Sequence, residues 1–130
     1  MTDRPADRRY SREHEWVLLE GATALVGITD YAQEELGDVV FLNLPKVGDR
    51  VTQYGKLGEV ESVKAVSDLF APVSGEVVEV HQELLDNPQW VNEDPFGKAW
   101  MVRVRVRDRA EINNLMTAEQ YAKFLEGLEH

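Results

Sequence analysis

Apolar and polar residues alternate over several short stretches of the chain, and glycine and proline separate these stretches. Such alternation between turn signals is typical of half-buried β-strands. The stretches predicted as strands are Trp16–Leu19, Ala24–Ile28, Val39–Leu44, Leu57–Val63, Val66–Phe70, Glu76–His81 and Trp100–Arg107. Residues 47–51 add a turn into a further short strand. Many short strands of this kind predict a mainly β fold, either a sandwich or a flattened barrel.

Two segments carry helix signals instead. Asp30 and Gln33 resemble a capping box, and Gly37 suits a C-terminal stop, so we predict a short helix between them. A second capping signature, Thr117 with Gln120, predicts a C-terminal helix over residues 117–128. Its apolar residues share one face, which we expect to pack on the sheets: Tyr121, Phe124, Leu125 and Leu128. Residues 82–99 contain turn signals and show no clear period.

The last predicted strand separates two kinds of side chain. Strict alternation places Trp100, Val102, Val104 and Val106 on one face, and Met101, Arg103, Arg105 and Arg107 on the other. A row of arginines can bind anions. We expect this row to be a solvated sheet face with salt bridges to nearby acids, because that arrangement is far more common.

Composition narrows the class of protein. The chain has 130 residues, 43% of them hydrophobic, so we expect a single domain over residues 1–130 with a flexible polar start at residues 1–9. The net charge of −10 argues against nucleic acid and against an anionic membrane surface, but permits docking to basic protein surfaces. No apolar run approaches a membrane span, and no signal peptide is evident. We therefore expect a cytoplasmic monomer.

The chain contains no cysteine, which excludes disulfides, thiolate metal sites and a cysteine nucleophile. The histidines His14, His81 and His130 are far apart in sequence and do not have the spacing of metal ligands. Any redox chemistry must therefore take place on an added group, and no metal is expected.

Lys64 lies at the centre of the two alternating stretches Leu57–Val63 and Val66–Phe70. This pattern places a primary amine at the tip of a β-hairpin, outside any pocket that could lower its pKa for catalysis. Such a lysine is open to a modifying enzyme. The pattern alone is consistent with a lysine bearing lipoate, a lysine bearing biotin, or an ordinary surface lysine.

The sequence around Lys64 resembles the lipoyl-attachment segment of glycine cleavage system H proteins, and the resemblance covers roughly residues 10–125. The segments that carry it are His14–Val17, Gly27–Gln33, Leu36–Phe41, Glu59–Ala65, Ser67–Asp68, Ala71–Val77, Val91–Gly97, Trp100–Met101 and Leu115–Tyr121. Val63 and Ala65 flank the lysine where biotin carriers usually have methionines, so the resemblance favours lipoate.

The resemblance implies a hybrid barrel-sandwich of two antiparallel sheets with short flanking helices. It also implies lipoic acid in amide linkage to Lys64, and a non-catalytic carrier that shuttles the aminomethyl group of glycine among enzymes. The implied partners are a pyridoxal-phosphate glycine decarboxylase, a tetrahydrofolate-dependent aminomethyltransferase, a dihydrolipoyl dehydrogenase and a lipoylating enzyme. Carriers of this family shelter the loaded arm in a cleft.

By matching positions, the resemblance assigns the cleft to Glu15, Ile28, Ala32, Leu36 and Asp68. A carboxylate there would pair with the protonated amine of the cargo, and apolar side chains would exclude water. Glu13 and Glu35 depart from the Ser and His that other members carry. Taken alone, Ile28 and Leu36 are more typical of a core, and Asp68 is typical of a turn.

Three other functions are consistent with parts of the sequence. A biotin carrier would share the fold and the modified lysine. A lipoyl relay would pass its group on to other enzymes, and the sequence does not distinguish it from the carrier. An independent enzyme would need a nucleophile and base or a metal cluster, and the sequence shows neither.

Overall fold

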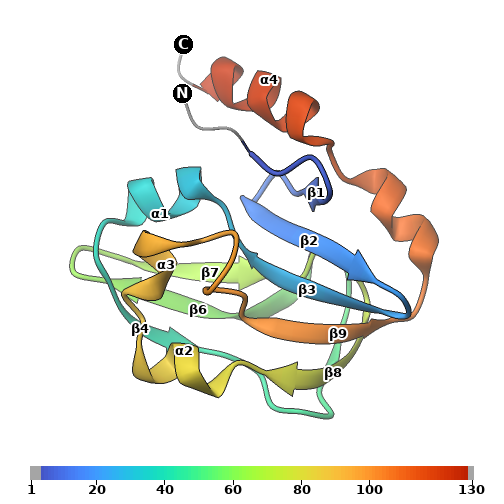
Figure 1. The fold of residues 1–130 in the computed structure, drawn as a ribbon, viewed down its shortest axis with the longest axis horizontal. Coiled ribbons are helices and arrows are strands. Elements are labelled where there is room, and N and C mark those ends of the chain that lie inside the picture. The colour runs from blue at the N-terminus through green and yellow to red at the C-terminus, as the bar shows by residue number, and fades with distance from the viewer. Residues whose placement is uncertain (1–3, 129–130) are drawn as a thin grey trace.

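The computed structural model describes residues 4–128, which form two antiparallel β-sheets with short helices around them (Figure 1). The larger sheet has six strands in the order β1-β2-β3-β9-β8-β5. They span Arg9–Tyr10, Glu15–Glu20, Thr23–Ile28, Val102–Val106, Gly75–Val80 and Arg50–Val51 in that order. The smaller sheet has the order β4-β6-β7, spanning Val39–Asn43, Lys56–Ser62 and Val66–Phe70. The predicted sandwich of two antiparallel sheets is confirmed.

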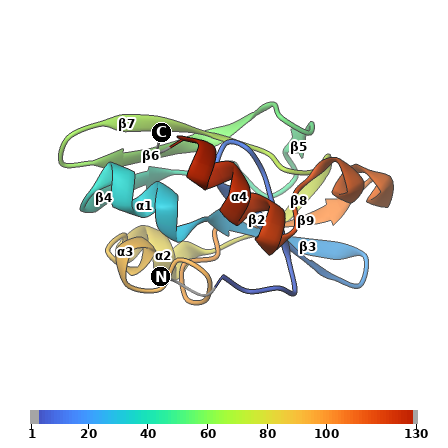
Figure 2. The ribbon, with the colours of Figure 1, turned by 90° about the horizontal axis from the view of Figure 1, so that it is seen from above.

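The alternation along β2 divides its side chains between two apolar clusters. Val17 and Leu19 pack into the main core with residues of both sheets, such as Val60 of β6 and Val77 of β8. Trp16 and Leu18 belong to a second cluster that contains residues of helix α4 (Ala118–Leu128). Figures 1 and 2 show α4 lying beside β1 and β2. The C-terminal helix therefore packs on a sheet as predicted, through buried Tyr121 and Leu125, whereas Leu128 is 49% exposed.

The helix after β3, α1 (Asp30–Leu36), begins one residue earlier than the sequence suggested. Its N-cap is Thr29, whose hydroxyl accepts from the amide of Ala32, so the prediction of Asp30 as the capping residue is wrong. Asp30 instead pairs with Arg4, with 2.9 Å between Arg4 Nε and Asp30 Oδ1. The predicted stop at Gly37 is confirmed, with φ at 79°. Near the C-terminus, Thr117 and Gln120 form the predicted reciprocal capping box.

Strict alternation fails where β9 begins. Met101 and Val102 are both buried in the main core, so the prediction that Met101 shares a face with the arginines is wrong. The ladder between β8 and β9 ends at Val102, so the regular alternation that we predict from Trp100 onward begins only at Val102. Arg103 does pair with Glu20 and Glu79, as a solvated sheet face requires.

Residues 82–99 contain two short helices that the sequence did not predict, α2 (Gln82–Asp86) and α3 (Trp90–Glu93). A 3₁₀ helix over Arg109–Asn114 precedes α4. The segment 1–9, for which we predict flexibility, makes contacts in its described part: Arg4 pairs with Asp30, and Arg8 donates to the carbonyl of Phe96. The helices found within residues 4–128 are all too short or too polar to cross a lipid bilayer.

Candidate functional site: the Lys64 hairpin and its groove

Lys64 lies in the turn between β6 and β7, where its side chain is exposed. The two strands pair as far as Glu61 and Val66, and the turn closes with a hydrogen bond of 2.8 Å from the amide of Ser62 to the carbonyl of Ala65. The buried hydroxyl of Ser62 accepts from the amides of Lys64 and Ala65. The predicted hairpin is confirmed, and its tip is internally hydrogen-bonded.

The tip is also fastened to the rest of the fold. The amide of Val63 donates to the carbonyl of Asp38 at 3.0 Å, and Val39 of β4 pairs with Ser62. Asn92 of α3 fixes the same turn between α1 and β4: its side-chain amide donates to the carbonyl of Gly37, and its oxygen accepts from Val39. The backbone of the lysine turn is thus bonded to the turn between α1 and β4, which Asn92 in turn holds in place.

A groove with a volume of about 390 Å³ opens beside the hairpin tip. One wall is α1 and the other is the start of β7, with the turn before β2 at one end. Its lining residues are Glu13, His14, Tyr31, Ala32, Glu35, Leu36, Ala65, Val66 and Ser67. Figures 1 and 2 both show α1 next to the hairpin tip. A chain attached to Lys64 therefore has an adjacent surface along which to lie.

The structure brings only part of the predicted cleft set to this groove. Ala32 and Leu36 line it. Ile28 is 3% exposed and belongs to the main core. Asp68 lies on β7 with its side chain 49% exposed and faces Lys56, with 3.4 Å between Asp68 Oδ1 and Lys56 Nζ.

Glu15, the remaining predicted cleft residue, is buried on β2 and joins the two sheets. The hydroxyl of Ser11 lies 2.6 Å from its Oε1, and the amide of Phe70 on β7 donates to its Oε2 at 3.1 Å. Burial raises the pKa of Glu15 from 4.5 to about 8, more than these hydrogen bonds lower it. The carboxyl is therefore predominantly protonated at neutral pH.

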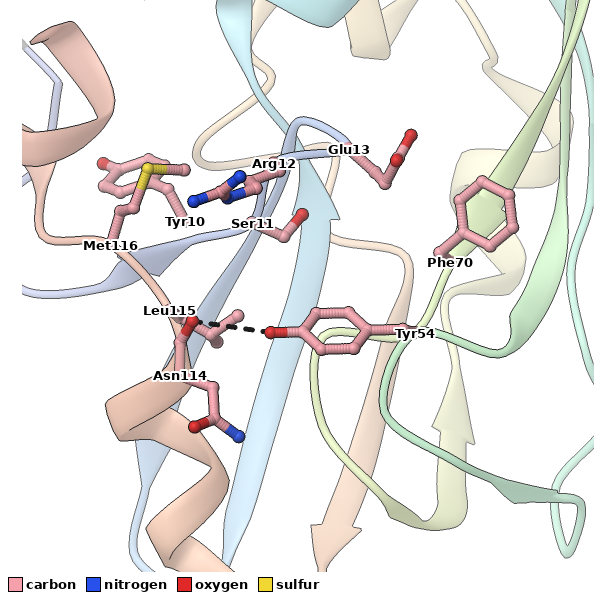
Figure 3. Close-up of a pocket in the computed structure, with 9 residues that line it drawn as sticks. All are labelled: Tyr10, Ser11, Arg12, Glu13, Tyr54, Phe70, Asn114, Leu115 and Met116. Atoms are coloured by element: carbon pink, nitrogen blue, oxygen red, sulfur yellow. Dashed lines mark hydrogen bonds between the residues drawn. The ribbon is translucent and has the colours of Figure 1, made fainter. Parts of the chain in front are cut away.

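A larger pocket of about 450 Å³ lies on the other side of Glu13 (Figure 3). Figure 3 shows the rings of Tyr54 and Phe70 on one side of it and Tyr10 and Met116 on the other. Ser11 and Phe70, the two residues that hold Glu15, both line this pocket, whereas no residue of the Lys64 turn does. We therefore place the candidate site in the groove beside the hairpin.

Among residues 4–128, no three His, Cys, Asp or Glu side chains gather as a metal site would require. The exposed amine of Lys64 lies next to a groove lined by apolar and acidic residues, so a group attached to this amine has a surface beside it.

Comparison with known proteins identifies the family. The sequence model described as "Glycine cleavage H-protein" matches residues 8–128. The chain belongs to this family. The H protein of Carboxydothermus hydrogenoformans is 54% identical to it over 122 residues, which are 94% of this chain and 94% of that protein. The H protein of Geobacillus kaustophilus is 58% identical over 117 residues, 90% of this chain and 92% of that protein.

The fold agrees with the same family. A crystal structure of the glycine cleavage system H protein from Mycobacterium marinum superimposes with a TM-score of 0.87 at 42% sequence identity. The match covers 95% of this chain and 99% of that chain. The barrel-sandwich expected from the resemblance to H proteins is thus the fold that the structure shows.

Sequence reasoning missed several groove residues of this H-protein family member. His14 and Tyr31 were not assigned to the cleft, and neither were Val66 and Ser67. One signal was available, because Tyr31, Ala32, Glu35 and Leu36 share one face of a helix at intervals of one, three and four residues. For His14 no comparable signal exists, since its position depends on a turn whose geometry the sequence does not reveal.

Proposed function

We propose that this protein is the lipoyl-bearing carrier of the glycine cleavage system, with lipoic acid in amide linkage to Lys64. The observation that carries the proposal is an exposed primary amine on a hydrogen-bonded hairpin tip, beside a groove. Membership of the H-protein family supports the same role and favours it over a biotin carrier or a lipoyl relay.

The residues around Lys64 suit a long acyl arm. The amine is exposed, so a ligating enzyme can reach it, and amide formation removes its charge. Ala32, Leu36, Ala65 and Val66 give the groove apolar surface for methylene groups. The dithiolane of lipoate supplies a disulfide that accepts a one-carbon unit as it is reduced. The protein's own contribution is to hold the attachment point and offer the groove.

In this role the chemistry takes place on partner enzymes. The proposed partners are the pyridoxal-phosphate glycine decarboxylase, the tetrahydrofolate-dependent aminomethyltransferase, the dihydrolipoyl dehydrogenase and a lipoylating enzyme. A tethered group reaches each partner's site at high effective concentration without tight binding of the whole carrier. We further propose that the protein acts as a monomer in the cytoplasm and has no catalytic site of its own.

The proposed arm contacts are Glu15, Ile28, Ala32, Leu36 and Asp68. Their positions support the proposal unequally. Ala32 and Leu36 already face the groove. Glu15 and Ile28 are buried, so an arm would reach them only after side chains above them move, and Asp68 would have to leave Lys56.

Intact mass tests the proposed function. Protein expressed with lipoate should gain the mass of one lipoyl group, and peptide mapping should place it on Lys64; a biotinyl mass would contradict the proposal. Lys64→Arg should fold normally and lose both the added mass and glycine cleavage activity.

Lys56→Arg is the matched control for that experiment. Lys56 is on the same hairpin and is also exposed, but its amine pairs with Glu59 and Asp68. The control should remain lipoylated at Lys64. Glycine cleavage by Lys64→Arg at the unchanged rate would refute the carrier role of Lys64.

A further inference from the structure

His14 stands at the end of the groove on an unusual backbone. Its φ is 71°, in the left-handed region that side chains other than glycine seldom adopt. Two hydrogen bonds hold it there: its amide donates to the carbonyl of Ser11 at 3.1 Å, and its carbonyl accepts from the amide of Thr29 at 3.0 Å. Strain of this kind persists where the surroundings enforce it, and functional sites often contain it. The turn directs the imidazole toward helix α4 and the groove.

A chain of hydrogen bonds determines which imidazole nitrogen carries the proton. Tyr121 Oη lies 2.8 Å from both His14 Nδ1 and Thr29 Oγ1. Thr29 is fully buried, and its oxygen already accepts from the amide of Ala32. Within residues 4–128, Tyr121 Oη is the acceptor available to the hydroxyl proton of Thr29. Thr29 therefore donates to Tyr121, Tyr121 donates to Nδ1, and the imidazole proton resides on Nε2.

The surroundings of the ring keep it neutral. Tyr31 packs on it at 4.7 Å between ring centroids, and Phe124 at 6.2 Å. Burial lowers the pKa of His14, although the nearby carboxylates of Glu13 and Glu35 oppose the shift. Arg12 lies over the ring of Phe124 and Arg4 over the ring of Tyr121, so each guanidinium faces an aromatic ring. A charged imidazole carries a proton on both nitrogens, so Nδ1 would have to donate to Tyr121. Tyr121 would then have to donate to Thr29, and the hydroxyl proton of Thr29 would lose its acceptor.

His14 lies at the end of the groove where the far end of a lipoyl arm on Lys64 would lie. The side chain of Lys64 lies beside Gly37, at the C-terminal end of α1, while His14 bonds to Thr29 at the N-terminal end. The seven residues of α1 span roughly 10 Å. An extended lipoyl chain is long enough to cover this length, so if it follows the helix its sulfur end, not its amide, would lie near His14.

We propose that His14 is a positioning residue for the arm: its Nε2–H donates a hydrogen bond to the sulfur end and so retains that end in the groove. The proposal rests on the proposed lipoylation of Lys64. A reduced sulfur is a better acceptor than a disulfide sulfur, because it can carry negative charge. His14 therefore holds the reduced arm more firmly than the oxidised arm.

Nitrogen-15 NMR of the imidazole rings tests the first step without any activity assay. In unmodified protein, His14 should show the Nε2–H form. His81 is an internal reference, because its Nδ1 lies 2.6 Å from the carbonyl of Trp100 and must donate to it, which gives the opposite form. Tyr121→Phe should remove the preference at His14 and leave His81 unchanged. An Nδ1–H form at His14 in the unmodified protein would overturn the proposal.

The same spectra of lipoylated protein test the contact with the arm. Reduction with a phosphine should shift the Nε2 signal of His14 and leave His81 in place. A lipoylated protein in which the His14 signals do not respond contradicts this inference alone. A protein that takes up no lipoyl mass contradicts the proposed function as well, so the two failures are distinguishable.

A chemical readout tests what the contact does. Reduced protein is alkylated with iodoacetamide over a range of pH, and the midpoint reports the thiol pKa. His14→Phe keeps a ring but removes the donor, so the midpoint should rise by about half a pH unit or more. His81→Phe, which keeps a ring beside Trp100, should not change it. Equal midpoints for His14→Phe and the unsubstituted protein would overturn the proposal.

Discussion

The side chain of Lys64 lies against Gly37. A β-carbon at position 37 would stand 3.4 Å from Cε of the lysine, and the glycine has a φ of 79° and a ψ of −154°. This region of backbone space is essentially restricted to glycine. The proposed attachment lysine thus depends on a neighbour that no other residue replaces without strain.

Gly37→Ala should lower the free energy of unfolding by about 1–3 kcal/mol and slow lipoylation. The strain acts on the turn whose Asp38 carbonyl holds Val63, and so it displaces the lysine. Urea unfolding and the initial rate of lipoyl addition measure the two effects. Gly21→Ala is the matched control: its φ is 66° and no atom lies within 4 Å of its added carbon. A control that slows lipoylation equally would disprove the link to Lys64.

The buried carboxyl of Glu15 makes stability depend on pH. Its pKa is about 8 in the folded protein and near 4.5 when unfolded, so the folded state binds the extra proton. Its stabilising contribution is complete below pH 4.5 and is lost as the pH rises through 8, at up to about 1.4 kcal/mol per pH unit. Glu15→Gln keeps the shape of the side chain and removes the carboxyl group that titrates.

Between pH 6.5 and 8, the carboxyl of Glu15 should dominate the change of stability with pH. His14, with a lowered pKa, acts in the opposite sense, mainly near and below pH 6.5, where the unfolded state binds more protons, and its contribution is the same in both proteins. Between pH 6.5 and 8, urea unfolding should show stability falling with pH in the unsubstituted protein and nearly constant in Glu15→Gln. The same slope in both proteins would mean that Glu15 is ionised when folded.

Tyr121→Phe should reduce stability by about 1–3 kcal/mol, because it leaves the hydroxyl of buried Thr29 and Nδ1 of His14 without their partner. Thermal or urea unfolding measures the loss. Tyr31→Phe serves as the comparison, since no hydrogen bond of the Tyr31 hydroxyl occurs within residues 4–128, and its stability should change little. Equal losses in the two variants would show that packing, not hydrogen bonding, is responsible.

The groove should protect an aminomethyl group carried on the proposed arm. Leu36→Ala widens the wall beside the hairpin and admits water, so the bound group should be lost faster than from the unsubstituted protein. Asp68→Ala tests the proposed carboxylate on the outer face of β7. Mass spectrometry of the loaded protein over time gives both lifetimes.

Val40→Ala is the control for the lifetimes, because Val40 is 47% exposed and does not line the groove. Lifetimes of Leu36→Ala and Val40→Ala that equal that of the unsubstituted protein would refute sheltering by the groove.

The sequence was sufficient for features that depend on local pattern. Alternation revealed the Lys64 hairpin, and the capping residues Thr117 and Gln120 revealed α4, because these signals operate within a few residues. The sequence was insufficient where contacts between residues far apart in the chain determine the local structure. Asp30, which we predict as the N-cap of α1, instead pairs with Arg4, 26 residues away in the chain, and Thr29 is the cap.

The candidate site likewise has one part that the local sequence reveals and another that it does not. Lys64 is identified by its own flanking residues, and family membership supports its proposed role. The groove is formed by three separate segments, so only the folded chain shows that His14 and Ser67 share it. The local sequence does not predict the positive φ of His14 or its hydrogen bond to Tyr121, 107 residues later.

The fastened hairpin tip has a consequence for recognition. The turn that bears Lys64 is bonded to Asp38, and Asn92 of α3 holds the residues on either side of Asp38, so the turn takes its place beside the groove only in the folded chain. If Lys64 is lipoylated as proposed, the lipoylating enzyme should recognise a folded, hydrogen-bonded turn and not a flexible peptide tag. An excised hairpin peptide should therefore be a far poorer substrate than the whole protein, and newly made chains would be modified only once folding is complete.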